Sequence, residues 1–470
     1  MAGIGFELRK YLQDDTFTGS AKAYGFAGLI SAGPWVLSIL GVMLIGIVAV
    51  SMSLVDDQVR QFTTSVTWLM GASLILTGFL QLMFTRFVAD RLYERQFEII
   101  NSNLFGALLL SVVVSVAVGG VLAVTLFEES LAYEVLMIAN LAALSAVWIA
   151  VIFVAGLRRF KIILWTFAIA YAVTVIMSLA FLSQGLEGLL LGLFIGHVLL
   201  VFMMVGAIVP EYPVVGRVRW DFLVLPKIHP ILIWVGLFYN LGIWVDKFIF
   251  WLHPDTSEFV IGPLRTSIIY DLPIFLAYLS IIPGMAVFLL TIETEFAEAY
   301  EGFFAAVRGN ASLQEIEQLG NAMVVAVREG LFQIVRVQGI TVLLLYVLGP
   351  SIVKWLELPD KFVHLYYVDL VGVAAQVLML AVLNVAFYLD KLREALTLTI
   401  FMFVTNALFT WLSIQWGPVY FGYGFGVSMA LTALLGVVMV ARELENIEFH
   451  TFMRQRKVKS IQPMLSKGEV

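Results

Sequence analysis

The chain has 470 residues, of which 61% are hydrophobic and only 13% are charged, and its mean hydropathy is +0.95. A soluble protein of this length needs far more charge to cover its surface. The sequence has no cysteine, which excludes disulfides, thiolate catalysis and cysteine-ligated metal sites. The net charge of −6 does not orient the chain in a membrane, because the orientation rule counts lysine and arginine.

Long apolar stretches recur along almost the whole chain. A helix of about 20 apolar residues crosses the roughly 30 Å hydrocarbon core of a bilayer. The stretches do not alternate polar with apolar residues, so a membrane barrel is excluded. The sequence therefore predicts an all-α polytopic membrane protein with twelve spans: 23–50, 63–85, 103–126, 133–155, 160–182, 187–209, 230–252, 271–291, 332–353, 363–389, 394–414 and 420–441.

Lysine and arginine predict the orientation of these spans. One side holds Arg60, Arg265, Lys354 and Lys361, Lys247 falls within a span, and the other 23 of the 28 basic residues lie on the opposite side. The side richer in lysine and arginine is the cytoplasmic one, so both termini are expected there. The first 22 residues contain no apolar core of a cleaved signal peptide, so the first span is expected to insert by itself.

The loop lengths divide the spans into two sets of six. In each set the longest loop follows the second helix, and a tight basic turn joins the fourth and fifth helices. Duplicated halves with a site at their interface are a common transporter plan, although a coincidence of loop lengths stays open as the alternative. The predicted parts are a cytoplasmic amphipathic N-terminus (1–22), an N-lobe (23–209), a cytoplasmic linker (210–229), a C-lobe (230–441) and a basic cytoplasmic tail (442–470).

A cytoplasmic insert, residues 292–331, separates the eighth and ninth spans. Its first 39 residues hold seven glutamates against Arg308 and Arg328, and its apolar residues recur at helical spacing. Ser312 and Glu315 form a capping-box pattern, which predicts that a second short helix begins there. Two interpretations stay open: a helical hairpin packed under the bundle, or a docking site for a cytoplasmic partner.

The seventh span carries the strongest candidate site, because charges inside a bilayer are costly. Asp246 and Lys247 lie about five residues before Leu252, roughly 8 Å inside the helix end. Neighbours on a helix point about 100° apart, so each of the two is expected to need another partner. Lys247 could instead extend its ammonium to the membrane surface. Asn240 lies about two turns from Asp246, near the middle of the membrane.

Two further aspartates lie toward the same side of the membrane. Asp271 opens the eighth span, and Asp369 lies a few residues into the tenth. Clustered oxygens suit a cation, and a buried carboxyl suits a proton. Asp246 with Asp369 is the preferred pair for coupling to H⁺ or Na⁺. The alternative is a structural ion pair of Lys247 with one of these carboxylates.

Other polar and helix-bending residues are weaker candidates. His197 lies near the centre of the sixth span, where a lone histidine is more often a hydrogen-bonding group between helices than a proton relay. Similar bonding is expected of the polar residues Asn140, Gln376, Asn384 and Asn406. Proline kinks a helix, and kinked spans can line cavities or act as hinges. The candidates for such a role are Gly33, Pro34, Pro273 and Pro283.

Enzymatic motifs are missing from the sequence. It has no Walker A loop, no HExxH and no GxSxG, so the chain is not expected to be an enzyme. No metal site, cofactor or nucleic-acid partner is expected. The hydrophobic composition implies that the chain contacts membrane lipid.

Three stretches resemble the PelG family. They are MAGIGFELRKYL at the start, GFAGLISAGPWVLSIL in the first span, and FYNLGIWVDKFIFW in the seventh. The similarity extends over the twelve spans and the insert. The resemblance implies an inner-membrane transporter for the cationic exopolysaccharide Pel, with a fold of the MATE-like flippase superfamily. It also implies work with the cytoplasmic glycosyltransferase PelF and the membrane proteins PelD and PelE.

The resemblance further implies a V-shaped cavity. In MATE-type relatives this cavity is lined by spans 1, 2 and 4 of one lobe and spans 7, 8 and 10 of the other. Asp246, Asp271 and Asp369 fall on spans 7, 8 and 10, and cation-coupled relatives use carboxylates on spans 7 and 10. Two other functions stay open: a cation-driven exporter of small molecules or lipid-linked oligosaccharide, and a membrane scaffold for a cytoplasmic glycosyltransferase.

Overall fold

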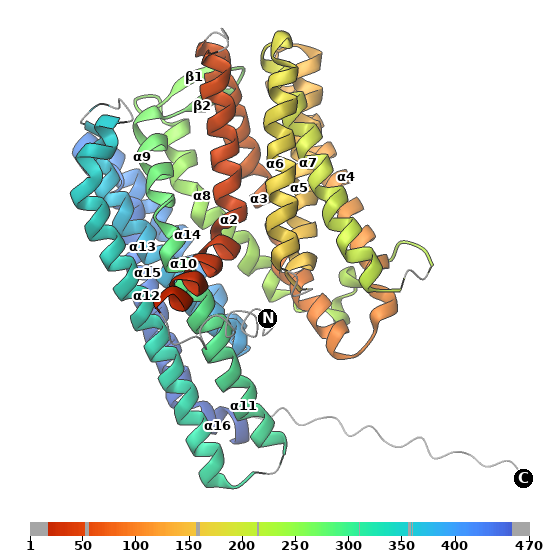
Figure 1. Ribbon diagram of the computed structural model, residues 1–470, viewed down its shortest axis with the longest axis vertical. Helices are drawn as coiled ribbons and strands as arrows, with labels where there is room; N and C mark the ends of the chain where they lie inside the picture. The colour runs from red at the N-terminus through yellow and green to blue at the C-terminus, as the bar shows by residue number, and fades with distance from the viewer. Residues whose placement is uncertain are drawn as a thin grey trace, which may run out of the picture.

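The computed structural model describes the backbone of residues 17–51, 56–156, 160–213, 216–309, 311–355, 359 and 361–453. The expected N-terminal segment up to residue 16 and the tail from 454 lie outside these ranges. The chain is a bundle of long helices with one small hairpin (Figure 1). The first six long helices are α2 (Phe17–Ser51), α3 (Asp56–Tyr93), α4 (Ile100–Leu126), α5 (Leu131–Gly156), α6 (Phe160–Ala180) and α7 (Leu186–Ile208).

A linker of short 3₁₀ turns, η3 (Val209–Glu211), η4 (Asp221–Leu223) and η5 (Leu225–Lys227), leads to the second set of helices. The second set also contains two strands, β1 (Glu258–Ile261) and β2 (Leu264–Thr266), which pair antiparallel with Phe259 opposite Arg265. The helices are α8 (Ile231–Leu252), α9 (Ile268–Tyr278), α10 (Ile281–Leu290), the π-helix η6 (Thr291–Phe296), α11 (Ala297–Arg308), α12 (Leu313–Trp355), α13 (Lys361–Tyr388), α14 (Leu392–Trp416), α15 (Tyr423–Glu445) and α16 (Ile447–Met453).

Eleven helices in the described part are long and apolar enough to cross a membrane. The expected first span falls on α2, whose described apolar stretch, Val36–Val50, is shorter. The all-helical, multi-pass prediction is therefore confirmed, and the count of twelve stays a prediction.

The insert differs from its predicted form. Ser312 does cap a helix, because the amide of Glu315 donates to its Oγ at 3.3 Å. The helix that begins there is not short: α12 continues for 43 residues into the expected ninth span. At 1.5 Å per residue this is about 65 Å, roughly twice the thickness of a bilayer core. The N-terminal part of α12, α11 and α16 therefore project from the bundle (Figure 1), and we call this the stalk end.

Pro283 explains why the eighth span is broken into α9 and α10. A proline has no amide hydrogen and its ring displaces the carbonyl four residues earlier, here that of Leu279. Helix α9 ends at Tyr278, and α10 begins at Ile281. Gln338 of α12 donates its Nε2 to the carbonyl of Ser280 at 3.0 Å, which satisfies an acceptor at the break. Pro273 lies within α9.

The two sets of helices meet where α3 crosses α8. Gly236 lies against Gly78, so close that a Cβ at position 236 would stand 2.2 Å from the carbonyl oxygen of Gly78. About two turns away along α3, Gly71 leaves room for the Trp244 ring. Small residues let helix backbones approach closely in membranes. Helix α2 also connects the sets, because it packs on both α6 and α10 and changes direction between them (Figure 1).

Polar contacts join the two sets at both ends of this crossing. At the end that carries the strands, which we call the hairpin end, Arg60 pairs with Glu258 at 3.1 Å and Trp68 donates to the carbonyl of Arg265 at 2.8 Å. At the stalk end, Arg86 of α3 pairs with Asp390 at 3.4 Å. Helix α3 thus contacts the second set at points from Arg60 to Arg86.

The linker is fixed to the first set by Asp221. Asn103 of α4 donates to its Oδ2 at 3.1 Å and accepts from its backbone amide at 2.9 Å. Lys227 and Arg219 pair with the same carboxylate at 2.7 and 2.8 Å. Burial alone would raise the pKa of Asp221, but these hydrogen bonds and charges outweigh burial and hold the pKa below its usual range.

Candidate transport site

A charged cluster is buried inside the second set of helices. Asp246 is 0% exposed and Lys247 is 1% exposed, both on α8. The Lys247 ammonium donates to Asp246 Oδ2 at 3.0 Å, to the carbonyl of Ile243 at 2.9 Å and to the Tyr278 hydroxyl at 3.2 Å. The ammonium therefore uses all three of its donors.

Asp246 and Lys247 pair with each other, so the expectation that these neighbours cannot face one another is wrong, whereas the expectation that each has another partner is confirmed. Side chains on a helix lean toward its N-terminus, and the four-carbon stem of lysine is long enough to bend back past its neighbour. The ammonium thereby reaches both the Asp246 carboxylate and the carbonyl one turn earlier. Lys247 does not extend to the surface. The alternative of an ion pair between Lys247 and a carboxylate is realised with Asp246.

Neutral donors complete the surroundings of Asp246. Tyr270 of α9 donates its hydroxyl to Oδ2 at 2.6 Å, and Asn406 of α14 donates to Oδ1 at 3.2 Å. The Tyr270 ring stacks on Phe250 with centroids 3.8 Å apart, which fixes its orientation. Tyr278 in turn donates to Gln376 of α13 at 3.1 Å. Side chains from α8, α9, α13 and α14 thus form one hydrogen-bonded network.

Asp369 of α13 lies beside this network but outside its hydrogen bonds. It is 0% exposed, and neither carboxylate oxygen accepts a hydrogen bond from any residue that the structure describes. Both Lys247 and Asp246 lie close enough to interact with it electrostatically. Gly422 also borders it, because a Cβ at that position would lie 3.0 Å from Asp369 Oδ1. The structure thus brings the expected pair, Asp246 and Asp369, into one cluster.

Asp271 lies apart from this cluster, at the base of the hairpin. It accepts from the Trp251 indole at 2.8 Å, from the Thr266 hydroxyl at 2.8 Å and from the Ser267 amide at 3.0 Å. The carboxylate thereby ties the end of β2 to α8 and α9. Trp251 also contacts Trp68 of α3, with ring centroids 4.9 Å apart. Asp271 is therefore part of the contact between the two sets at the hairpin end.

A cavity of about 470 Å³ lies beside Asp271, between the two sets of helices. Its walls come from α2, α3, α8 and α9, and most of the lining is apolar. Asp271 and Arg60 are its charged residues. Trp244 also borders the cavity, although its side chain is only 3% exposed. The remaining lining residues are Ser38, Ile39, Val42, Met43, Val59, Thr63, Thr64, Val66, Thr67, Met70, Thr266, Ile268, Leu272, Phe275, Leu276 and Leu279.

The other expected residues lie apart from both places. Asn240 donates to the carbonyl of Gly236 at 2.9 Å and borders Gly78, so it belongs to the helix crossing. His197 faces the Tyr171 hydroxyl at 3.3 Å between α7 and α6. Gly33 is buried against Leu164 of α6. Pro34 lies in the helical stretch of α2, and its side chain lies outside the described residues.

Sequence reasoning missed several residues of the cluster. Tyr278 is a tyrosine within the eighth span, where a hydroxyl far from the membrane surface could have marked it, whereas Tyr270 directly precedes that span. Gln376 and Asn406 were expected only as bonds between helices. Glu293 was expected in the cytoplasmic insert without a role of its own, but it is 4% exposed and accepts from Asn384 at 2.9 Å and Tyr388 at 3.1 Å. It lies on η6, and π-helical turns are frequent at functional sites.

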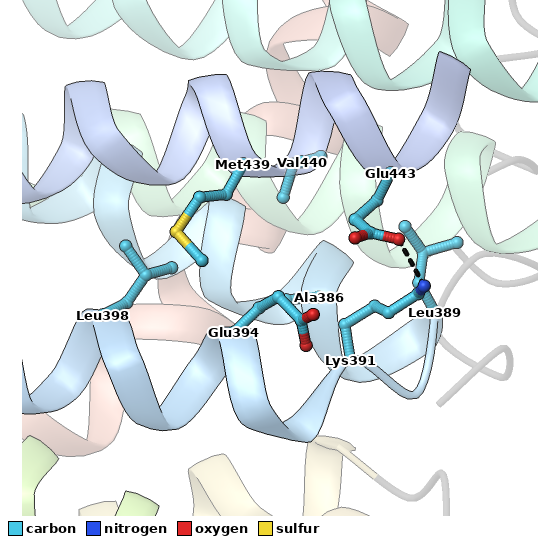
Figure 2. Close-up of a pocket in the computed structure, with 8 residues that line it drawn as sticks. All are labelled: Ala386, Leu389, Lys391, Glu394, Leu398, Met439, Val440 and Glu443. Atoms are coloured by element: carbon cyan, nitrogen blue, oxygen red, sulfur yellow. Dashed lines mark ion pairs between the residues drawn. The ribbon is translucent and has the colours of Figure 1, made fainter. Parts of the chain in front are cut away.

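A second, far smaller pocket lies at the stalk end of α13, α14 and α15 (Figure 2). Its volume is about 10 Å³, which holds no more than one water. Lys391 forms an ion pair with Glu443 across it. This pocket is too small for a transported molecule.

Comparisons with known proteins agree with this architecture. Residues 1–452 match the family described as "PelG: Putative exopolysaccharide Exporter (EPS-E)". No curated protein matches the chain.

Solved structures of similar fold are transporters. An outward-facing multidrug resistance MATE family transporter of the MOP superfamily superimposes with a TM-score of 0.64 at 13% identity, over 90% of this chain and 96% of that one. A MATE transporter in the bent conformation gives 0.62 at 10% identity, over 92% and 97%. A mutant of the Vibrio cholerae MATE transporter VcmN gives 0.61 at 12% identity, over 94% and 98%. At these identities the likeness establishes the MATE-like fold alone.

Proposed function

We propose that this chain, which belongs to the PelG family of exopolysaccharide exporters, moves a Pel-type polysaccharide across the bacterial inner membrane through the space between its two sets of helices. The chain is a transporter and not an enzyme. The observation that carries the route is the 470 Å³ cavity whose walls come from both sets. Ligand sites in transporters lie at such interfaces between halves.

The size of the cavity favours movement in short steps. Sites of about 300–1,000 Å³ enclose a small molecule, so this cavity can hold a few sugar units and not a long polymer. The polymer would therefore pass while a glycosyltransferase extends it. The half-buried Phe275 ring offers an apolar face on which a sugar can stack, and Asp271 offers a hydrogen-bond acceptor.

The buried cluster is proposed to drive or gate the movement. Asp246 and Lys247 lie on α8, which crosses α3 at Gly78, while Asp369 lies on α13. A change of charge in the cluster would alter hydrogen bonds to α9 and α14 through Tyr270 and Asn406. Since α8 and α9 also supply walls of the cavity, such a change would reach the route directly.

Orientation and partners follow from the basic residues and the family. Both termini and the stalk are proposed to lie in the cytoplasm, which places the hairpin on the outer side. PelF, PelD and PelE are the proposed partners in synthesis. The exposed part of α11 and α12 would be the surface nearest to a cytoplasmic glycosyltransferase.

The test is polymer secretion by the Asp246→Asn variant. This substitution keeps the shape of the side chain and removes its charge, so we expect the variant that reaches the membrane to secrete no polymer, with secretion expressed per amount of membrane-inserted protein. Asp255→Asn is the matched control, because its side chain is 90% exposed beside the hairpin. Normal secretion by Asp246→Asn would refute the role of the cluster.

Export of a small molecule is the second candidate. The mostly apolar lining of the cavity and the likeness of the fold to a multidrug resistance transporter favour it. Purified protein in vesicles, without any polysaccharide synthase, separates the two functions. Uptake of a small organic cation would favour this candidate, and its absence would favour polysaccharide.

A further inference from the structure

The oxygen atoms around Lys247 form a set that suits a bound cation. They come from the Asp246 carboxylate, the Ile243 carbonyl and the Tyr278 hydroxyl, at 2.9 to 3.3 Å from the ammonium. The rings of Tyr278 and Phe425 each present a face 5.1 Å from the same nitrogen. Hard cations take carboxylate and carbonyl oxygens as ligands. In this chain the ammonium of Lys247 already occupies the centre of that set.

The charges of the cluster do not balance without a further positive charge. Asp246 and Lys247 neutralise each other, which leaves the carboxylate of Asp369 in excess. Asp369 is fully buried and accepts no hydrogen bond from the described residues. An isolated carboxylate in a membrane interior is very costly, and protonation removes that cost. In the cluster, Asp246 is stabilised as a carboxylate by Lys247 and by hydrogen bonds, whereas Asp369 has no such partner among the described residues. Asp369 is therefore the carboxyl group that keeps a proton.

From this arrangement we infer that Lys247 occupies the place of an alkali cation, so that the cluster exchanges a proton at Asp369 and does not bind sodium. The inference rests on the proposed role of the cluster in transport, and it assigns the ion. Two acidic groups and one lysine then hold one exchangeable proton between them.

The groups that face Asp369 from the surrounding helices support this assignment. Among the described residues, Lys247 is the one cation placed near it, and every other neighbour is acidic, phenolic or neutral. The titratable neighbours are Asp246 and Lys247 on α8 and Tyr270 and Tyr278 on α9. Asn406 of α14 lies against Asp246, and Phe425 of α15 lies against Lys247. A negative charge on Asp369 would compete with Asp246 for the ammonium. Loss of the proton would therefore loosen the contact of Lys247 with Asp246.

Equilibrium binding of radioactive sodium to the purified full-length protein tests the inference without any export. We expect the wild type to show no saturable binding. Lys247→Met removes the ammonium but keeps the length of the side chain, so this variant should gain a saturable sodium site. Adding Asp246→Asn to it removes the carboxylate that would hold the sodium ion and should abolish the gain. Lys354→Met changes an exposed lysine and should behave as the wild type. Saturable binding to the wild type that Asp369→Asn abolishes would overturn the inference.

Infrared spectroscopy of the unaltered cluster supplies a second readout. At neutral pH the wild type should show the carbonyl stretching band of a protonated, buried carboxyl group. The band should disappear in Asp369→Asn and persist in Asp271→Asn. This result stands even if Lys247→Met does not fold, and absence of the band from the wild type would refute the inference. Normal secretion by Asp246→Asn would refute the transport role and leave both ion measurements unchanged, so the two failures are distinguishable.

Discussion

Gly236 of α8 lies directly against the backbone of Gly78 of α3, where the two sets of helices cross. A Cβ at position 236 would stand 2.2 Å from the carbonyl oxygen of Gly78, and one at position 78 would stand 3.0 Å from the carbonyl oxygen of Gly236. Neither contact can be relieved by a side chain alone, because both atoms are backbone. The closeness of the two sets at this point therefore depends on both residues being glycine.

The first prediction concerns this crossing. Gly236→Ala forces the two backbones apart, and overpacking of this kind costs about 1–3 kcal/mol of stability. We expect a lower temperature of unfolding in detergent and reduced secretion. Gly120→Ala on α4 is the control, because no atom lies within 4 Å of its added Cβ. Equal stability of the two variants would show that the crossing is not tightly packed.

The second prediction concerns the buried ion pair. Removing one partner leaves an uncompensated charge, so Asp246→Asn or Lys247→Met alone should destabilise the protein by about 3–5 kcal/mol. The double variant carries neither charge of the pair and should be closer to the wild type than either single variant. Thermal unfolding of the four proteins, read as a double-mutant cycle, measures the interaction. Strict additivity would mean that the pair does not interact.

The sequence predicted much of the fold, because the membrane imposes strong constraints on helix length and composition. The expected spans fall on long helices, except for the eighth, which is divided between the short helices α9 and α10, and Ser312 caps α12 as its motif indicates. The length of α12 was not predictable, since the helix crosses from a polar into an apolar region without a break. The buried state of Glu293 was missed for a related reason: its partners Asn384 and Tyr388 lie on α13, far along the chain.

The third prediction concerns the hairpin end. The chain has no cysteine, so Leu276→Cys places a single thiol on the cavity wall. Trp68→Phe keeps a ring but removes the hydrogen bond to Arg265, and a bond of this kind contributes about 0.5–1.5 kcal/mol. Loss of this bond weakens the contact between the two sets at the hairpin end, so water-soluble reagents should enter the cavity more easily. We therefore expect a water-soluble maleimide to label the thiol at position 276 several-fold faster.

Glu258→Gln is the comparison for that experiment. Its ion pair with Arg60 is solvent-exposed, and exposed pairs contribute about 0–1 kcal/mol. Labelling should therefore change little. If Glu258→Gln accelerates labelling more than Trp68→Phe does, the ion pair and not the indole holds the hairpin.

The fourth prediction concerns pH and Asp221. The folded protein holds the pKa of this carboxyl below its unfolded value, which is about 3.9. Its contribution to stability is therefore fully present above that value and is lost as the pH falls through the lower, folded value. Asp221→Asn should be less stable than the wild type at neutral pH, and the difference should shrink in acid. A difference that grows in acid would contradict the ion pairs with Lys227 and Arg219.

The candidate site was only partly predictable from the sequence. Intramembrane charge alone selected Asp246, Lys247 and Asp369, which the fold brings into one cluster. The pairing of adjacent residues was missed because it depends on how a flexible lysine side chain bends. Asp271 was grouped with the cluster by its depth, but its hydrogen bonds to Trp251 and Thr266 assign it to the hairpin. The depth of a residue in the membrane can be predicted from its position in a span. The partners that its side chain contacts depend on how the neighbouring helices pack.

Photochemical cross-linking during secretion tests the proposed route most directly. A benzoylphenylalanine at Leu276 faces the cavity, whereas one at Leu434 lies on a side chain that is 62% exposed on α15. In cells that secrete the polymer, the first should retain covalently bound polysaccharide after illumination and the second should not. No sugar on the first position while secretion continues, or equal amounts on both, would contradict passage of the polysaccharide between the two sets of helices.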